Sequence, residues 1–270
     1  MEKCALQGVE FKKGETGSLC FAVREISEDL KIEIRSRLSE ICNGAAKASR
    51  NTTLYSYQRT LSAFFQKFDT KSSDTQKGMI GELLTHVLLL HYESDFRSAS
   101  TFFNLEEDSI KKGFDLVLHH DTTGQIWFVE VKAGDCGGKT SIQKLGDLLS
   151  LAKNGLKTAL NSKRFTLWQN AVHGATVVIQ DRSLKEQIEN LLEGYNEKAL
   201  EGESTSTDYN AALVAVSYLG NQEFATPEEF DRRHNAQKEM NEFHDLISIA
   251  FQKDTFQSVV EFLRGEIKDV

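Results

Sequence analysis

Proline and cysteine are scarce in this chain, and their scarcity excludes several classes of protein. Pro227 is the one proline in 270 residues, so proline does not interrupt long helices elsewhere. The four cysteines stand far apart, at Cys4, Cys20, Cys42 and Cys136, with no Cys-x-x-Cys pair. This spacing argues against a zinc site or a disulfide framework, and it is typical of a protein of the reducing cytoplasm.

Long apolar segments are also lacking. The longest apolar stretch, within residues 79–90, is interrupted by Glu82 and His86 and is too short to span a bilayer. The first residues do not form a charged-then-apolar leader with a small-residue cleavage site. We therefore expect a soluble, cytoplasmic protein that does not act in a membrane.

The chain has no excess of positive charge. Its 40 acidic residues outnumber its 32 basic ones, for a net charge of −8, which speaks against a freestanding high-affinity nucleic-acid binder. Residues 138–164 differ, since they hold six basic residues and one acidic residue, Asp147. Such a segment favours contact with a phosphodiester backbone, although lysines that only solvate a helix would give the same pattern.

What the sequence does have is a charged β-hairpin. Two runs rich in Val, Leu, Ile and aromatic residues, 113–120 and 126–133, flank a polar turn that ends in Gly124. Because side chains alternate along a strand, Glu130 and Lys132 share one face, together with Ile126 and Phe128. Burial of unpaired charge is costly, so these two groups need a partner, a metal or a catalytic role.

Asp115 of the first run completes a set of chemically active groups at one end of this hairpin. Carboxylates and water are the ligands that Mg²⁺ prefers, and a bound divalent cation can polarise a phosphoryl oxygen and lower the pKa of a water molecule. Lys132 would add positive charge on the side from which water attacks. The pattern predicts metal-dependent phosphodiester hydrolysis with Mg²⁺, for which we expect Mn²⁺ to substitute. A structural hairpin closed by a Glu130–Lys132 or Asp115–Lys132 ion pair is the alternative.

Hydrophobic periodicity predicts the remaining elements. Helices are expected over 28–42, 54–68, 75–92, 140–160, 183–200 and 228–268, and strands over 19–25, 99–105, 210–219 and, ambiguously, 175–180. The order of elements from Gly78 to Leu219 resembles the core of the PD-(D/E)xK nuclease superfamily. The resemblance implies an α/β, restriction-endonuclease-like core with a small mixed sheet flanked by helices, plus N- and C-terminal helical additions.

Residues 71–220 would form this nuclease core. Residues 1–70 would be an N-terminal α/β addition available for partner docking, and residues 221–270 a C-terminal helical extension. In the superfamily, the aspartate of the second strand and the acidic residue of the third bind the metal ion, which implies these roles for Asp115 and Glu130. The lysine two positions on, here Lys132, acts on the attacking water.

The resemblance also implies that a glutamate of the preceding helix, Glu82, completes the metal shell. Pairing of Glu82 with His86, one helical turn away, is the alternative. Lys139, Gln143 and Lys144 are weaker candidates for DNA contact, each equally open to interpretation as a helix-surface residue. His119 and His120, which close the first hairpin strand, are expected to be turn residues rather than a general base.

A narrower resemblance rests on Gly81-Glu82-Leu83-Leu84, Gly113 to Asp115, and Glu130 to Lys132. This combination resembles the HamA family, the nuclease-like subunits of Hachiman anti-phage defence, which work with a helicase partner, HamB. It implies a DNA endonuclease whose partners are DNA and a HamB-like helicase. Two alternatives stay open: a restriction endonuclease or Holliday-junction resolvase on the same core, and a catalytically silent subunit that only binds DNA or a partner.

Overall fold

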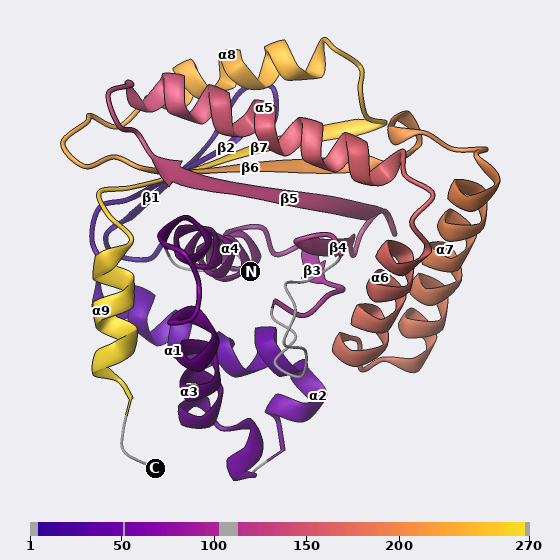
Figure 1. Cartoon of the computed structure of the whole chain (residues 1–270), viewed down its shortest axis with the longest axis horizontal. Helices are drawn as coiled ribbons and strands as arrows, with labels where there is room; N and C mark the ends of the chain where they lie inside the picture. Colours follow the sequence, from indigo (N-terminus) through magenta and orange to yellow (C-terminus); the bar gives the residue numbers. More distant parts are fainter. Residues whose placement is uncertain (1–4, 51, 103–112, 268–270) are drawn as a thin grey trace.

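A seven-stranded mixed sheet forms the centre of the molecule. The computed structural model describes residues 5–50, 52–102 and 113–267. The strands lie in the order β1-β2-β7-β6-β5-β4-β3 (Figure 1). They are β1 (Val9–Lys13), β2 (Leu19–Val23), β3 (Phe96–Ser98), β4 (Leu116–His120), β5 (Ile126–Asp135), β6 (Asn210–Tyr218) and β7 (Asp245–Lys253).

The middle of this sheet is parallel and its edges are antiparallel. Strand β6 pairs in parallel with β5 and β7, and β7 pairs in parallel with β2. Strands β1, β4 and β3 add antiparallel pairings at the two edges. All nine residues of β6 are buried, as expected of a central strand covered on both faces.

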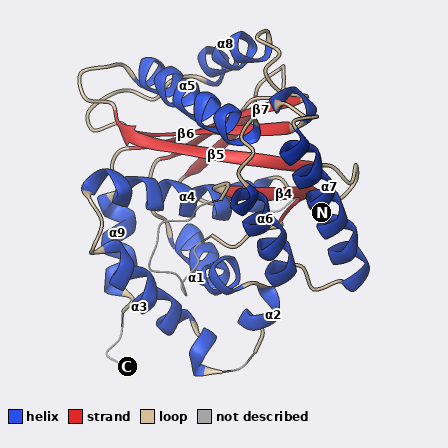
Figure 2. Cartoon of the chain, turned by 45° about the vertical axis from the view of Figure 1, so that its right-hand side comes forward, coloured by secondary structure: helices blue, strands red, loops and turns tan. Residues whose placement is uncertain are grey.

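Helices cover both faces of the sheet (Figures 1 and 2). Helices α5 (Ser141–Leu160) and α8 (Pro227–Lys238) lie on one face, and α4 (Ser73–Tyr92) lies on the other. The remaining helices are α1 (Glu28–Asn43), α2 (Ala45–Ala48), α3 (Tyr57–Phe68), α6 (Phe165–Val178), α7 (Arg182–Glu201) and α9 (Gln257–Gly265). In the described parts of the chain, no helix has both the length and the apolar character needed to cross a membrane. The α/β architecture with a mixed sheet is the predicted fold class.

Two apolar cores, one on each face, confirm the predicted alternation along β5. Val129 and Val131 pack in the core that contains the buried side of α4, whereas Ile126 and Phe128 pack in the core beneath α5, α6 and α7. Glu130 and Lys132 are therefore on the α5 side of the sheet, since they alternate with the two valines.

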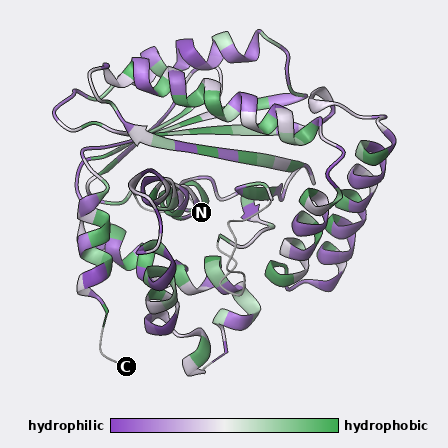
Figure 3. Ribbon diagram, in the orientation of Figure 1, coloured by the Kyte–Doolittle hydropathy of each residue, from purple (hydrophilic) through white to green (hydrophobic). Residues whose placement is uncertain are grey.

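The helices that flank the hairpin begin and pack as their sequences predict. Thr140 caps α5 in a capping box with Gln143, in which each side chain accepts a hydrogen bond from the other residue's backbone N–H. Ser72 caps α4 through its side chain, which accepts from the Thr75 N–H. Hydrophilic and hydrophobic residues alternate along α5 (Figure 3), and its leucines Leu145, Leu149 and Leu156 face the sheet.

Three of the sequence-based assignments are wrong. Residues 175–180, given ambiguously as a strand, largely belong to α6, because Ala175 packs in the core shared with α7 and tertiary packing overrides the β-branched composition. Residues 245–253, expected to be helical, form β7, which pairs with β6 and β2. The strand expected at 99–105 lies at Phe96–Ser98 instead, and 103–105 lie outside the described residues.

The sheet also draws together the three segments into which the sequence was divided. Strands β1 and β2 come from residues 1–70 and β7 from residues 221–270, so the last segment is not purely helical. The buried Gln252 side chain of β7 accepts hydrogen bonds from Ser141 Oγ at the start of α5 and from the Ala225 N–H, both at 2.7 Å. The domain boundaries themselves stay a prediction.

Candidate metal-binding site at the β4–β5 hairpin

The β4–β5 ladder ends where the charged residues begin. The last paired residues are Leu116 and Val129. Beyond them, the Val131 N–H donates to Asp115 Oδ2 at 2.8 Å instead of to a backbone carbonyl. The aspartate therefore holds the two strands together at the point where their backbones separate, beside Glu130 and Lys132.

Phe114 anchors this aspartate in the core. Its ring lies 4.4 Å from that of Phe128 and 5.4 Å from that of Trp168, measured between centroids, and its side chain is buried. An aromatic cluster thus restricts the chain immediately before Asp115.

Glu130 and Lys132 form an ion pair on the α5 side of β5. Lys132 Nζ lies 2.6 Å from Glu130 Oε1. The Lys132 side chain is 36% exposed and the Glu130 side chain 15% exposed. Burial, together with the nearby charge of Asp115, raises the pKa of Glu130 to about 7 against the opposing effect of Lys132. Two carboxylates thus share a poorly solvated space with one ammonium group.

Lys132 remains a cation in this environment. Burial lowers its pKa, but the charges of Glu130, Asp115 and Glu82 outweigh burial, and the net effect is a raised pKa. A permanently protonated lysine can orient water and stabilise negative charge, but it cannot remove a proton. Glu82 contributes to this raised pKa from α4, which covers the opposite face of the sheet (Figure 1).

Gly81 lets α4 pack close to strands β5 and β6. A methyl group at Gly81 would lie 3.0 Å from Ala133 Cβ on β5 and 3.2 Å from Val216 Cγ2 on β6. The missing side chain lets the helix backbone approach both strands closely. Glu82, the next residue, is half-buried.

The donor set suits a hard divalent cation. Asp115 and Glu130 supply carboxylate oxygens, and a cation would favour the ionised form of Glu130, whose pKa is raised by burial and by the charge of Asp115. In the described residues, however, no three His, Cys, Asp or Glu side chains converge as a metal-binding cluster. Participation of Glu82 as a third ligand therefore stays a prediction.

The three weaker candidates lie at the start of α5 and in the loop before it. Gln143 is exposed, and its side chain accepts from the Thr140 N–H at 3.0 Å in the capping box. Lys139 is paired with Asp147. Lys144 lies closest to the site, since a methyl group at Gly134 of β5 would be 3.0 Å from Lys144 Nζ. Gly134 follows Lys132 by two residues and so shares its face of the strand.

Two further basic residues of 138–164 have partners between α8 and β7. Lys157 Nζ pairs with Glu242 Oε2 at 2.6 Å, and Lys153 Nζ lies 3.0 Å from Met240 Sδ. Both partners lie between α8 and β7. The excess positive charge noted in the sequence is therefore partly neutralised, and Lys144 is the member of the segment that reaches the strand of the candidate site.

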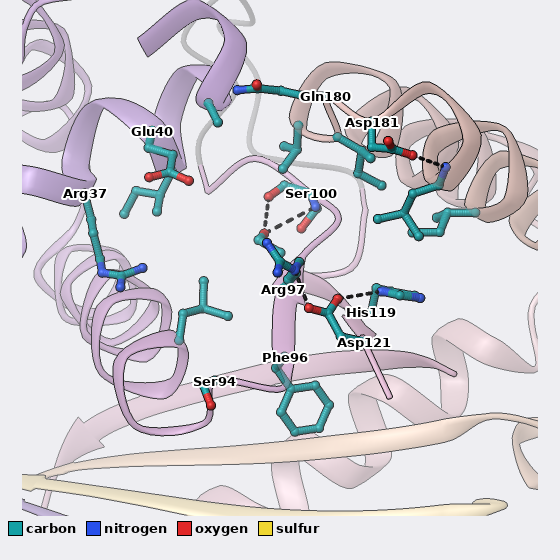
Figure 4. Close-up of a pocket in the computed structure, with 18 residues that line it drawn as sticks. Arg37, Glu40, Ser94, Phe96, Arg97, Ser100, His119, Asp121, Gln180 and Asp181 are labelled. Atoms are coloured by element: carbon teal, nitrogen blue, oxygen red, sulfur yellow. Dashed lines mark hydrogen bonds and ion pairs between the residues drawn. The ribbon is translucent and has the colours of Figure 1, made fainter. Parts of the chain in front are cut away.

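A separate cavity of about 840 Å³ lies away from these residues (Figure 4). Side chains of α1, β3, the end of β4 and the α6–α7 connection line it, and none of Glu82, Asp115, Glu130 and Lys132 is among them. His119 lines this cavity, with Nδ1 3.3 Å from Asp121 Oδ1. His120 Nδ1 accepts from the Thr123 N–H at 3.4 Å in the hairpin turn. Both histidines thus lie at the far end of β4 from Asp115.

The sequence analysis missed two features of the site. The Val131 N–H binds Asp115, and Gly155 of α5 lies against Glu130, where a methyl group would be 2.9 Å from Glu130 Oε1. The amide leaves no signal in the sequence. The glycine does, because a glycine inside a strongly helical pattern often has a packing or functional reason.

Replacing Glu130 by glutamine is expected to stabilise the metal-free protein above pH 7. The pKa of Glu130 in the fold, about 7, lies above its ordinary value, so ionisation between about pH 4.5 and 7 costs the wild type stability that the uncharged amide retains. We expect a gain of about 1–3 kcal/mol at pH 8, reduced by loss of the pair with Lys132. Urea unfolding at pH 4 and pH 8 measures it.

The matched control is Glu193→Gln on the surface of α7, where the residue is exposed. This change should leave stability within about 0.5 kcal/mol at both pH values. A Glu130→Gln variant that is less stable than wild type at pH 8 would show that the ion pair with Lys132 outweighs burial.

The sequence matches the HamA family model over residues 7–264, which takes in every strand and all but the last residue of α9. No curated protein matches the chain. The family match agrees with the resemblance carried by the α4 and hairpin residues, and it supports a role in anti-phage defence. The chain belongs to the HamA family.

Proposed function

We propose that this HamA-family chain is a Mg²⁺-dependent deoxyribonuclease, the effector of a defence complex controlled by a helicase partner. The observation that carries the proposal is the grouping of Asp115, Glu130 and Lys132 where β4 and β5 separate. The aspartate is fixed by the Val131 N–H, and the glutamate is buried against the lysine. Buried ionic groups of this kind are poor stabilisers, so their presence favours a functional role.

Asp115 and Glu130, with Glu82 as a third candidate, would hold the divalent cation. When bound, the cation would supply Lewis-acid polarisation of the phosphoryl oxygen and activation of water. Lys132, kept protonated by the surrounding carboxylates, would orient the attacking water and stabilise the charge that builds on the phosphate. The apolar core between α5 and the sheet, which contains Phe128, would limit solvent access to the site from that side.

An acidic protein with one cationic approach to its site would bind DNA weakly alone. With a net charge of −8 and several lysines of 138–164 already paired, the chain would depend on its helicase partner to deliver DNA. This dependence favours an effector within a complex over a freestanding restriction enzyme.

Incubation of supercoiled plasmid with the purified protein, in Mg²⁺ or in EDTA, tests the proposal. The same reactions are run with the helicase encoded beside it. Cleavage that requires Mg²⁺ supports the nuclease, and cleavage only with the helicase supports the controlled effector. A folded protein that binds DNA or the helicase but cleaves nothing in any reaction would favour a catalytically silent subunit.

Substitution of Lys144 should weaken DNA binding more than substitution of Lys139. Lys144 Nζ lies over Gly134 beside the site, whereas the charge of Lys139 is already paired with Asp147. We expect Lys144→Ala to reduce the slope of log affinity against log salt by about 1, with a smaller change for Lys139→Ala. DNA binding by fluorescence anisotropy in EDTA, with Lys198→Ala on α7 as control, measures it. Equal losses for all three variants would contradict the placement.

A further inference from the structure

Gly155 lies in the interior of α5, where glycine is unfavourable. The helix extends from Ser141 to Leu160, and glycine in a helix interior is disfavoured relative to alanine. The glycines with positive φ in the described parts of the chain do not include Gly155, so its backbone conformation does not require glycine. Another feature must explain why a side chain is missing here.

The missing side chain leaves room for the Glu130 carboxylate. A Cβ atom at Gly155 would lie 2.9 Å from Glu130 Oε1, 3.5 Å from Cδ and 3.7 Å from Cγ. The nearest of these atoms, Oε1, is also the oxygen that lies 2.6 Å from Lys132 Nζ. Added bulk at position 155 would therefore displace the atom that joins the two charged residues.

The crowding is specific to Glu130. A Glu side chain is flexible, so its end can move away from an added methyl group while the backbones of α5 and β5 stay in place. Movement of the carboxylate changes its position relative to both Lys132 and Asp115. A second glycine of the same helix, Gly146, provides a comparison, because a methyl group there would meet its nearest neighbour, Arg233 Nε, at an ordinary 3.6 Å.

We propose that Gly155 is a positioning residue, whose lack of a side chain sets where the Glu130 carboxylate lies relative to Lys132 and Asp115. Gly155 does not contact substrate or cation in this scheme; it acts through Glu130. The inference deepens the proposed function and rests on it for its cleavage and cation-binding readouts, but the contact between the two residues can be tested independently.

The test is a cycle of four proteins: wild type, Gly155→Ala, Glu130→Ala and the double variant. In the Glu130→Ala background, Gly155→Ala should raise Tm by about 2–4 °C, since it then adds only helix propensity. In wild type the same change should raise Tm less, or lower it, because the carboxylate must move. Gly146→Ala, the matched control, should raise Tm by about 2–4 °C in both backgrounds.

Mn²⁺ binding and plasmid cleavage then show whether the displacement matters for function. Gly155→Ala should weaken both by about 10–100-fold, and Gly146→Ala should leave both unchanged. An equal Tm shift from Gly155→Ala in both backgrounds, or unaltered Mn²⁺ affinity in a variant that shows the coupling, would overturn the inference. If wild type neither binds Mn²⁺ nor cleaves DNA even with the helicase present, the proposed function fails, and the Tm cycle alone still decides whether Gly155 positions Glu130.

Discussion

A Lys132→Met variant is expected to cleave DNA about 10²–10³-fold more slowly than wild type. Methionine keeps much of the length of the side chain but removes the ammonium group that lies 2.6 Å from Glu130 Oε1. Because the pKa of Lys132 is raised, the lost group is a cation rather than a base. The fold-loss should therefore be similar at neutral and moderately alkaline pH, whereas the loss of a lysine that acted as a base would grow as the pH rises.

The same variant should still bind divalent cations. Asp115 and Glu130 remain, and Glu130 no longer shares Oε1 with Lys132. Single-turnover cleavage and Mn²⁺ titration, measured on one preparation, separate the two effects. Lys198→Met, at the exposed end of α7, controls for loss of one positive charge. Cleavage within a few-fold of wild type would remove Lys132 from the proposed mechanism.

Enlarging Gly81 should have the largest effect on stability. Alanine there would place Cβ 3.0 Å from Ala133 Cβ and 3.2 Å from Val216 Cγ2, against two strands that cannot easily move. We expect Gly81→Ala to cost about 1–2 kcal/mol and Gly81→Val about 3 kcal/mol or more. Thermal unfolding of both variants measures the cost.

Gly78 provides a control on the same helix, because a methyl group there would meet nothing within 4 Å. Gly78→Ala should stabilise α4 by about 1 kcal/mol. Gly81→Ala should in addition impair cleavage, since it would move α4, and with it Glu82, away from β5. Equal stability of Gly81→Ala and Gly78→Ala would mean that α4 is not held against β5 and β6 by this contact.

Strand β5, which carries the candidate site, was predictable because its alternation of charged and apolar residues is typical of a strand alone. Along β5, charged Glu130 and Lys132 alternate with Val129 and Val131, and only a strand with two differently covered faces accounts for that period of two. The hairpin turn at Gly124 fixed its partner. Alternation, turn and charge agree, so the site residues could be proposed before the fold was known.

Strand β7 was not predictable in this way. It lies between β6 and β2 and is covered on both faces, so its central residues, 246–251, are apolar except for Ser248 and do not alternate with polar ones. Leu246 and Ala250 pack on the α5 side, and Ile249 and Phe251 on the α4 side. A run of apolar residues of this kind does not distinguish a buried strand from a helix by periodicity.

Contacts between distant elements account for the rest of what the sequence could not predict. Gly155 meets Glu130 across 25 positions of the chain, and the meeting depends on how α5 is packed on the sheet. The position of Glu82 depends likewise on the close approach of α4 at Gly81. Local patterns identify the groups that carry charge, whereas only the packed structure identifies the groups that hold them in place.

Divalent-cation binding to the isolated protein tests the central claim most directly, because it requires neither activation by a helicase nor a chosen DNA substrate. Mn²⁺ binding is measured by electron paramagnetic resonance for wild type and for Asp115→Asn, in which the amide oxygen can still accept from the Val131 N–H. The account predicts that wild type binds Mn²⁺, that Mg²⁺ competes, and that binding falls at least about tenfold in the variant. Binding that is absent from wild type, even with DNA and the helicase present, or that is unchanged in Asp115→Asn, would contradict it.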